Sequence, residues 1–417
     1  MDEKTERQLR RRAVRLHGAG HSLRAVGARL NRSRQWVAKW VRRFGKHGRP
    51  DLGSRSRRPR RQPTKTPAWV RRQVLRLRRK LERARMGLIG ARAIQRAWRT
   101  ECLPAPMPST ATIKRLLRAA GITGVQPTAP PAYFPAPRPT PTHALQAMDW
   151  TERYLEHGVK VYAFHTLDLD GRAAKQTISP NKTGATVGQH ALDSWQSLGI
   201  PAFLQLDNDA AFNGGYKAPR VIGQFVRLCL CVGVELIFLP VREAERNGAI
   251  ESFNHLWSQA FYDRQHFGSF AAVKASRDQF ENWYRHDYDP PKLNGQTPAQ
   301  VAGRVRPGHR LTDAARRSLP SPLPITAGRV HFIRPVSAEG AITLLNETWR
   351  VGQRLAGQYV WATIRTHRHT LSIYHRRAAS KPMRLVRVYP YPLPEAVQPL
   401  SPPFQTGRRR CKVSTMS

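Results

Sequence analysis

The chain has 417 residues, too many for one ordinary hydrophobic core, so its length predicts several domains. Its 71 Lys and Arg against 27 Asp and Glu give a formal charge of +44, which requires a polyanionic partner, most simply nucleic acid, although membrane-surface and ribosomal proteins share this balance. Apolar runs are too short to span a bilayer, the charged start is no secretory signal, and four cysteines without a CxxC pair predict a reducing cytoplasm.

The first elements are predicted to be a DNA-binding module. Residues 1–65 hold 21 Lys and Arg against 4 acids. Residues 1–52 read as a helix, a short helix, a turn and a third helix, with Ser22 and Ser33 where N-caps are expected. The buried stripe of the third helix is predicted to be Val37, Trp40, Val41 and Phe44.

The remaining face of that third helix carries the candidate DNA contacts, which are Arg34, Gln35, Lys39, Arg42 and Arg43. Arg and Gln near a helix start suit base edges, and later cations suit phosphates. We therefore predict a helix-turn-helix DNA-binding domain over residues 1–52. The alternative is a small helical bundle with a solvated basic face.

A second helical module is predicted after a basic linker at residues 53–67. Over residues 68–122 a basic amphipathic helix carries Val70, Val74, Leu77 and Leu81 on one side, and two shorter helices follow. Ser109 or Thr110 is expected to cap the last helix. We predict a second helix-turn-helix-like domain, with a helical spacer as the alternative. Residues 123–142, with seven prolines in "PTAPPAYFPAPRPTP", predict an extended linker.

The pattern becomes strand-like in residues 143–304, which hold 17 of the 27 acids. Three strands, the last two flanking the "DGR" hairpin, lead into alternating helices and strands. This order predicts a mixed α/β sheet of the ribonuclease-H-like type. Such sheets collect polar residues from strand ends into one cleft.

Several acids compete for that cleft. Asp149 lies in the first strand, and Asp207 directly follows the apolar run of the fourth, which favours it over Asp209. Glu251 opens a helix and flanks its apolar stripe, whereas Glu243 and Glu245 are expected in an exposed loop. Carboxylates converging in a cleft suit Mg²⁺ or Mn²⁺. Asp168 and Asp170 are assigned to the hairpin turn, and Glu251 could alternatively be a helix-start acid favoured by the dipole.

The chain is predicted to end in a small β-barrel over residues 325–390 and a basic disordered tail over residues 391–417. The barrel segment contains short alternating strands such as "GRVHFIRPV" and "YVWATIRT". Its basic surface is expected to comprise Arg329, Arg334, Arg350, Arg365 and Arg368. A structural or dimerisation module is the alternative to DNA contact.

The segments "MDW", "LQLDND", "NGAIESFN" and "YDPPKLNGQTPAQV", in this order, resemble the catalytic core of DDE transposases of bacterial insertion sequences and retroviral integrases. The front segments, including "PSTATIKRLLRAAGI", resemble the tandem helix-turn-helix region of those transposases, and the C-terminal strands are similar to SH3-like ends. The resemblance covers roughly residues 10–375. The family often has Gly where Asp209 stands and Glu where Ala211 stands. Its usual spacing counts to Glu243, but the "NG" before the helix selects Glu251.

This resemblance implies that Asp149, Asp207 and Glu251 are the catalytic, metal-binding triad, holding two Mg²⁺ or Mn²⁺ ions. It further implies a polynucleotidyl transferase that cuts and joins double-stranded DNA as a homo-oligomer, at the bacterial nucleoid, with no nucleotide cofactor. Two alternatives remain at this point: a non-catalytic DNA-binding regulator derived from such an enzyme, and a metal-dependent nuclease without joining activity.

Overall fold

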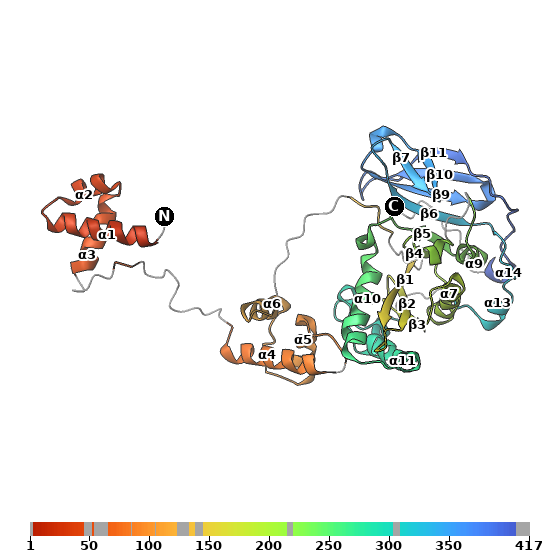
Figure 1. The fold of residues 1–417 in the computed structure, drawn as a ribbon, viewed down its shortest axis with the longest axis horizontal. Coiled ribbons are helices and arrows are strands. Elements are labelled where there is room, and N and C mark those ends of the chain that lie inside the picture. The colour runs from red at the N-terminus through yellow and green to blue at the C-terminus, as the bar shows by residue number, and fades with distance from the viewer. Residues whose placement is uncertain are drawn as a thin grey trace. The chain divides into compact units, whose positions relative to one another are not determined.

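A computed structural model describes residues 3–45, 52–53, 66–84, 86–104, 106–122, 133–137, 145–214, 220–302 and 309–405. The chain divides into two compact units, Met1–Trp69 and Val70–Ser417 (Figure 1). Most of the predicted linkers at 53–67 and 123–142 lie outside the described residues. None of the helices described is both long and apolar enough to cross a membrane.

The first unit is a three-helix module of α1 (Glu3–Gly18), α2 (Leu23–Leu30) and α3 (Arg34–Gly45). The hydroxyl of Ser22 accepts the Ala25 N–H, and that of Ser33 accepts the Trp36 N–H, so both predicted N-caps are confirmed. The core comprises Ala13, Val26, Leu30 and Val37. Phe44 was expected in the buried stripe but is 40% exposed.

Three helices follow, α4 (Ala68–Arg83), α5 (Ala91–Thr100) and α6 (Thr110–Ala119), and the boundary between the units falls two residues into α4. Of the two candidate caps, Ser109 is the one used, since its hydroxyl accepts the Thr112 N–H at 3.1 Å. These helices are joined to the α/β core of the same unit. The Gly87 N–H donates to the Ala260 carbonyl at 2.9 Å, and Arg264 donates to the Leu81 carbonyl at 3.0 Å.

The α/β core is built on β1 (Leu145–Tyr154), β2 (Lys160–Asp168), β3 (Ala174–Ser179), β4 (Phe203–Leu206) and β5 (Glu235–Phe238). These strands lie in the order β3-β2-β1-β4-β5, with β1 to β3 antiparallel and β4 and β5 parallel to β1. The predicted ribonuclease-H-like arrangement is therefore confirmed. Asp168 ends β2 and accepts the Asp170 and Gly171 N–H groups, as the turn assignment required.

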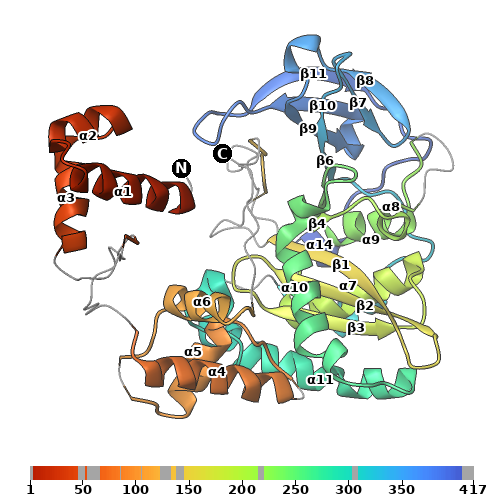
Figure 2. The same ribbon diagram turned by 60° about the vertical axis from the view of Figure 1, so that its left-hand side comes forward.

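Helices cover both faces of this sheet. On one face α7 (Gly184–Leu198) and α9 (Gln224–Val232) pack into a core with Met148, Leu204 and Leu236. On the other, α10 (Gly248–Ala260) and α11 (Phe270–His286) pack with Ala147 and Ile237. Figure 2 shows α10 lying alongside β1. The short helices between β4 and Thr370 are α8 (Ala210–Asn213), η1 (Ala244–Asn247), η2 (Tyr262–Arg264), η3 (Pro291–Leu293), α12 (Pro298–Val301), α13 (Asp313–Arg317), η4 (Gln353–Leu355) and η5 (Thr366–Arg368).

The C-terminal strands are antiparallel as predicted, but they extend the core sheet instead of forming a separate barrel. They are β6 (Arg329–Pro335), β7 (Ala341–Leu344), β8 (Glu347–Arg350), β9 (Tyr359–Arg365), β10 (Thr370–His375) and β11 (Arg384–Pro390). β6 pairs in parallel with β5, and β9, β10 and β11 follow outward, while β7 and β8 form a separate hairpin. Parallel pairing with β6 satisfies the edge of the apolar strand β5, which would otherwise be left open.

Two further segments differ from expectation. Residues 391–405 were placed in a disordered tail, yet Tyr391, Leu400 and Phe404 are buried, and Phe404 lies in a short helix, α14 (Pro402–Gln405). Their apolar side chains join the core shared by α9 and β6, which explains their order. Residues 406–417 lie outside the described part. Within the predicted proline-rich linker, the Phe134 ring packs edge-on against Tyr359, with centroids 5.2 Å apart.

Candidate active site

Asp149 lies in β1, Asp207 directly follows the neighbouring parallel strand β4, and both are on the same face of the sheet. In the register of β1 with β4, Ala147 pairs with Gln205, so Asp149 and Asp207 stand level two residues further on. Alternate residues of a strand share a face, and both aspartates fall on the side covered by α10. Sequence separation of 58 residues is thereby reduced to one strand spacing, about 5 Å between backbones.

Glu251 lies in the first turn of α10, which packs on β1. Asn254, three residues later and therefore on the same helix face, donates from Nδ2 to Asp149 Oδ2 at 2.7 Å. The Trp150 N–H donates to Asp149 Oδ1 at 2.8 Å. Both oxygens of Asp149 are thus oriented by partners, and α10 brings Glu251 toward the two aspartates.

Asn254 is itself fixed by a buried polar chain. Because its Nδ2 donates to Asp149, its Oδ1 must accept from His165 Nδ1, 2.6 Å away. The other ring nitrogen, Nε2, then accepts from Gln176 Nε2 at 3.1 Å. Burial lowers the pKa of His165 to about 4, so the ring is neutral at physiological pH and this tautomer is the one that completes the chain.

The pKa values of Asp149 and Asp207 are both raised, which shows that their charged forms are disfavoured. Burial, followed by the charge of Asp207, raises the pKa of Asp149 to about 7, and the Glu251 charge adds to the rise. The hydrogen bonds from Trp150 and Asn254 oppose it. Burial also raises the pKa of Asp207, against the Asp209 N–H and the Lys182 charge. Anions held close together and partly desolvated are costly unless a cation joins them.

The fit of a divalent ion can be judged from these donors. Asp149, Asp207 and Glu251 offer only hard carboxylate oxygens, the ligands that Mg²⁺ and Mn²⁺ prefer. In the described part of the chain, no group of three or more His, Cys, Asp or Glu side chains is gathered closely enough to hold an ion. The donor type and the mutual repulsion fit a metal site, while the side chains are not drawn together as a finished coordination shell.

The competing acids have other partners. Asp209 caps α8, its Oδ1 accepting the Ala211 N–H at 2.8 Å, and its own N–H donates to Asp207 Oδ1 at 3.0 Å. Glu243 was expected to be exposed, but it is half-buried, pairs with Arg246 at 3.0 Å and accepts from the Tyr359 hydroxyl at 2.5 Å. Glu243 therefore lies in the predicted loop before η1, but its contacts with Arg246 and with Tyr359 of β9 keep it from being exposed.

Sequence reasoning missed three residues around this cluster. They are Asn254, Lys182, whose Nζ lies 3.4 Å from Asp209 Oδ2, and Arg334. Arg334 was assigned to a basic surface but is 4% exposed, donating to the Asn208 side chain at 2.6 Å and to the Leu239 carbonyl at 2.7 Å. The one available signal was the spacing of Asn254 from Glu251, one helical turn.

The other cationic assignments in the C-terminal strands divide similarly. Arg329 is paired with Glu235 at 2.6 Å and so is not free for DNA, whereas Arg350 and Arg368 are exposed.

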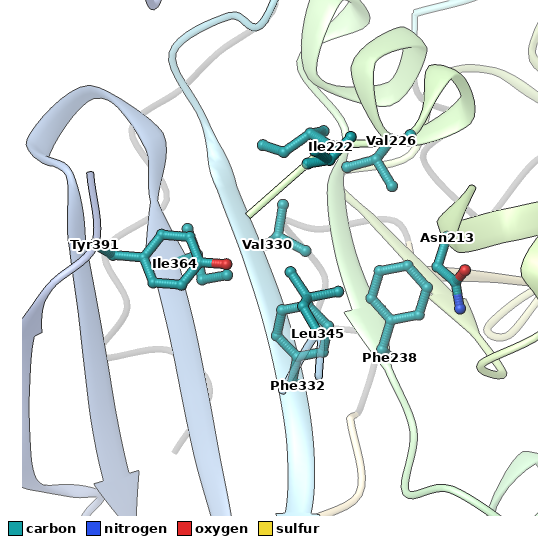
Figure 3. A pocket seen from close by; sticks show the side chains of 11 residues that line it. Asn213, Ile222, Val226, Phe238, Val330, Phe332, Leu345, Ile364 and Tyr391 are labelled. Carbon is teal, nitrogen blue, oxygen red and sulfur yellow. The ribbon is translucent and has the colours of Figure 1, made fainter. Parts of the chain in front are cut away.

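An apolar cavity lies on the opposite face of the sheet, between the start of α9 and β5, β6 and β9 (Figure 3). Its lining includes Ile222, Phe238 and Val330, with no acid or histidine among the lining side chains.

In the first unit, α3 presents the predicted DNA-contacting face. Arg34, Gln35, Lys39 and Arg42 are exposed, and Arg43 is half-buried with its guanidinium 5.0 Å from the centre of the Trp40 ring. Trp40 is buried beneath these cations at 4% exposure. The apolar side of the helix is therefore turned inward and its cations outward, as a groove-binding helix requires.

Comparison with known proteins gives one family-model match and several matches among solved structures. Residues 4–53 match the family model of the homeodomain-like domain, and no curated protein matches the chain. Among solved structures, the catalytic core of HTLV-2 integrase in complex with magnesium is 15% identical, with a TM-score of 0.28 over 39% of this chain and 98% of that one. The BIV integrase core is 16% identical, with a TM-score of 0.29 over 39% and 95%. The simian T-cell lymphotropic virus intasome with PP2A regulatory subunit B56 gamma is 13% identical, with a TM-score of 0.33 over 73% and 93%. The chain thus has a front end similar to homeodomain-like domains, ahead of the mixed α/β core.

Proposed function

We propose that this protein is a DNA transposase or integrase of the DDE class, which binds element ends and carries out metal-dependent strand cleavage and strand transfer. The observation that carries the proposal is the meeting of Asp149 and Asp207 across β1 and β4 beneath the helix of Glu251, with a pKa of about 7 for Asp149. A group of half-buried acids in a chain of charge +44 has a clear use if cations hold DNA and the acids hold metal.

In this proposal Asp149, Asp207 and Glu251 would hold Mg²⁺ or Mn²⁺, two ions per site. When bound, such ions supply Lewis-acid charge that activates water or a 3′-hydroxyl and stabilises the leaving oxygen. Asn254 and the Trp150 N–H orient the Asp149 carboxylate, and the Asp209 N–H orients that of Asp207. The α3 face would bind duplex DNA, and strand transfer at two ends would require a homo-oligomer on the DNA.

The test is Mg²⁺-dependent nicking of supercoiled plasmid and joining of end DNA by full-length protein. Asp207→Asn and Glu251→Gln should each abolish both reactions, because each removes a charged ligand, while DNA affinity stays within about twofold of wild type. Glu243→Gln is the matched control for Glu251 and should retain activity, since Glu243 contacts Arg246 and Tyr359 instead.

The outcomes distinguish the alternatives. Unchanged joining by either triad variant refutes the assignment of that residue. Wild-type protein that binds DNA but never cuts it with Mg²⁺ or Mn²⁺ is a regulator, and one that cuts without joining is a nuclease. Loss of activity in Glu243→Gln with retention in Glu251→Gln would move the third ligand to Glu243.

A further inference from the structure

Lys182 lies in the segment between β3 and α7, beside the three acids Asp149, Asp207 and Glu251, here called the acid cluster. Its Nζ is 3.8 Å from the centre of the Trp150 indole ring and 3.4 Å from Asp209 Oδ2. Trp150 directly follows Asp149, and Asp209 lies two residues after Asp207. Both supports of the ammonium group therefore adjoin the proposed metal ligands, and the side chain is still 39% exposed.

The contacts of Lys182 within the described residues leave hydrogen-bond donors of its ammonium group open. An ammonium group has three donors, and the hydrogen bond to Asp209 is the single one that Lys182 makes within the described residues. At 3.4 Å this bond is longer than the 2.7–2.9 Å usual for charged pairs, roughly a loose contact. The indole face holds the cation by its quadrupole without occupying a donor.

The pair with Asp209 has a plain physical effect. Asp209 is held in place by capping α8, so it acts as a fixed anion that keeps Lys182 beside the cluster. The family that the sequence resembles often has Gly where Asp209 stands. The pairing of Asp209 with Lys182 is therefore a property of this chain and not one carried over from the family. A DNA phosphate entering a group of three carboxylates meets strong repulsion, and a nearby cation with open donors offsets it.

We propose that Lys182 binds a phosphate of the DNA strand next to the phosphodiester that is cut. The inference rests on the proposed function, because it assumes that DNA enters this cluster. Lys182 is then a substrate-binding residue of the active site. The alternative is that Lys182 merely neutralises Asp209.

Two experiments on the full-length protein test this. The first is amine acetylation followed by mass spectrometry in EDTA, with and without a mixed-sequence duplex, which needs no catalysis. DNA should protect Lys182 several-fold. Lys160, the first residue of β2, is a matched control, since its Nζ pairs with Glu152 of β1 at 3.1 Å and lies 5.5 Å from the centre of the Tyr154 ring. It should stay reactive.

The second experiment measures plasmid nicking for Lys182→Gln, Asp209→Asn and the double variant. Asn retains the capping oxygen, so Asp209→Asn removes only the charge. Lys182→Gln should raise KM for DNA several-fold and lower the slope of log KM against log salt by about 0.7–0.9, the contribution of one phosphate contact. The double variant should keep this defect, and Lys160→Gln should show none.

Recovery of wild-type KM in the double variant would overturn the proposal, because charge balance alone would then explain Lys182. Equal acetylation of Lys182 with and without DNA overturns it as well. If the protein never cuts DNA but Lys182 is protected, the phosphate contact stands and the proposed enzymatic function fails. If it cuts and Lys182→Gln is unchanged, the function stands and the contact fails.

Discussion

Asp149 is the residue at which burial and charge conflict most clearly. Its carboxyl is half-buried against α10, faces the charges of Asp207 and Glu251, and has a pKa of about 7. In the unfolded chain the same carboxyl has an ordinary pKa of about 3.9. Between these two values the folded state keeps a proton that the unfolded state has lost.

This difference predicts a pH-dependent stability of the metal-free protein. Because the folded state binds more protons, the free energy of unfolding should fall as pH rises from about 4 to about 7, and then level off. Asp149→Asn should flatten this dependence and raise Tm at pH 8 relative to wild type. Thermal unfolding in EDTA across this pH range measures it.

The control for this prediction is Asp278→Asn. Asp278 lies in the middle of α11, and its side chain is 73% exposed. Its pH dependence should match wild type. Adding Mg²⁺ at pH 8 should raise Tm of wild type more than that of Asp149→Asn, since bound cation relieves the repulsion. An Asp149→Asn protein with the wild-type pH slope would contradict the account of the cluster.

At the scale of elements, β6 connects the C-terminal strands to the acid cluster. Arg334 lies in β6, and its guanidinium donates to the Leu239 carbonyl, just after β5, and to the side chain of Asn208. The Asn208 amide also donates to the Leu239 carbonyl at 2.6 Å. Asn208 sits between Asp207 and Asp209, so a strand from the C-terminal extension fixes the backbone that carries the second acid.

Arg334→Met should therefore loosen the segment from Asp207 to Asn213 without removing any acid. Leaving the Asn208 side-chain oxygen without its buried donor should cost about 1–3 kcal/mol in the free energy of unfolding, whereas the Leu239 carbonyl still accepts from the Asn208 amide. Hydrogen exchange of the backbone amides in this segment should speed up, and kcat for nicking should fall. Arg368→Met, at an exposed position, should change neither quantity. Unaltered exchange in Arg334→Met would refute the connection.

In the whole molecule, the proposed DNA-binding helix and the proposed catalytic acids lie in different compact units. The basic helix α3 lies in the homeodomain-like module, while the acid cluster lies in the α/β unit. Variants of the two should therefore have separable effects on DNA. Because the basic helix α3 and the half-buried acids lie in different units, one chain can carry both a high positive charge and a group of acids.

Arg42→Ala should weaken binding to all duplexes and lower the slope of log affinity against log salt by about 0.9, as expected for one phosphate contact. Gln35→Ala should instead reduce discrimination between sequences, because a side chain at the helix start reads base edges. Fluorescence anisotropy over a salt series measures both. Glu251→Gln, tested alongside, should leave the slope unchanged, and a change there would place the acid cluster in DNA binding.

Local sequence patterns were enough to predict most helices and strands, and they also indicated which acids to propose as metal ligands. Periodic apolar residues and capping hydroxyls act within a few residues, so α2, α3 and α6 were predictable with their caps Ser22, Ser33 and Ser109. The strand and helix order was predictable for the same reason, and it led to the ribonuclease-H-like sheet. Asp149 and Asp207 followed from their positions at the ends of apolar runs.

Tertiary structure alone decided how distant segments complete one another. The burial of Arg334, the contacts of Lys182 and the addition of β6 to β5 depend on residues up to 126 positions apart, and no local pattern encodes such distances. The same holds for residues 391–405, whose apolar side chains are too sparse to predict order until the core beneath them is known. Long-range pairing satisfies the open edge of β5 and the buried polar groups around it, and only the folded chain supplies the partners.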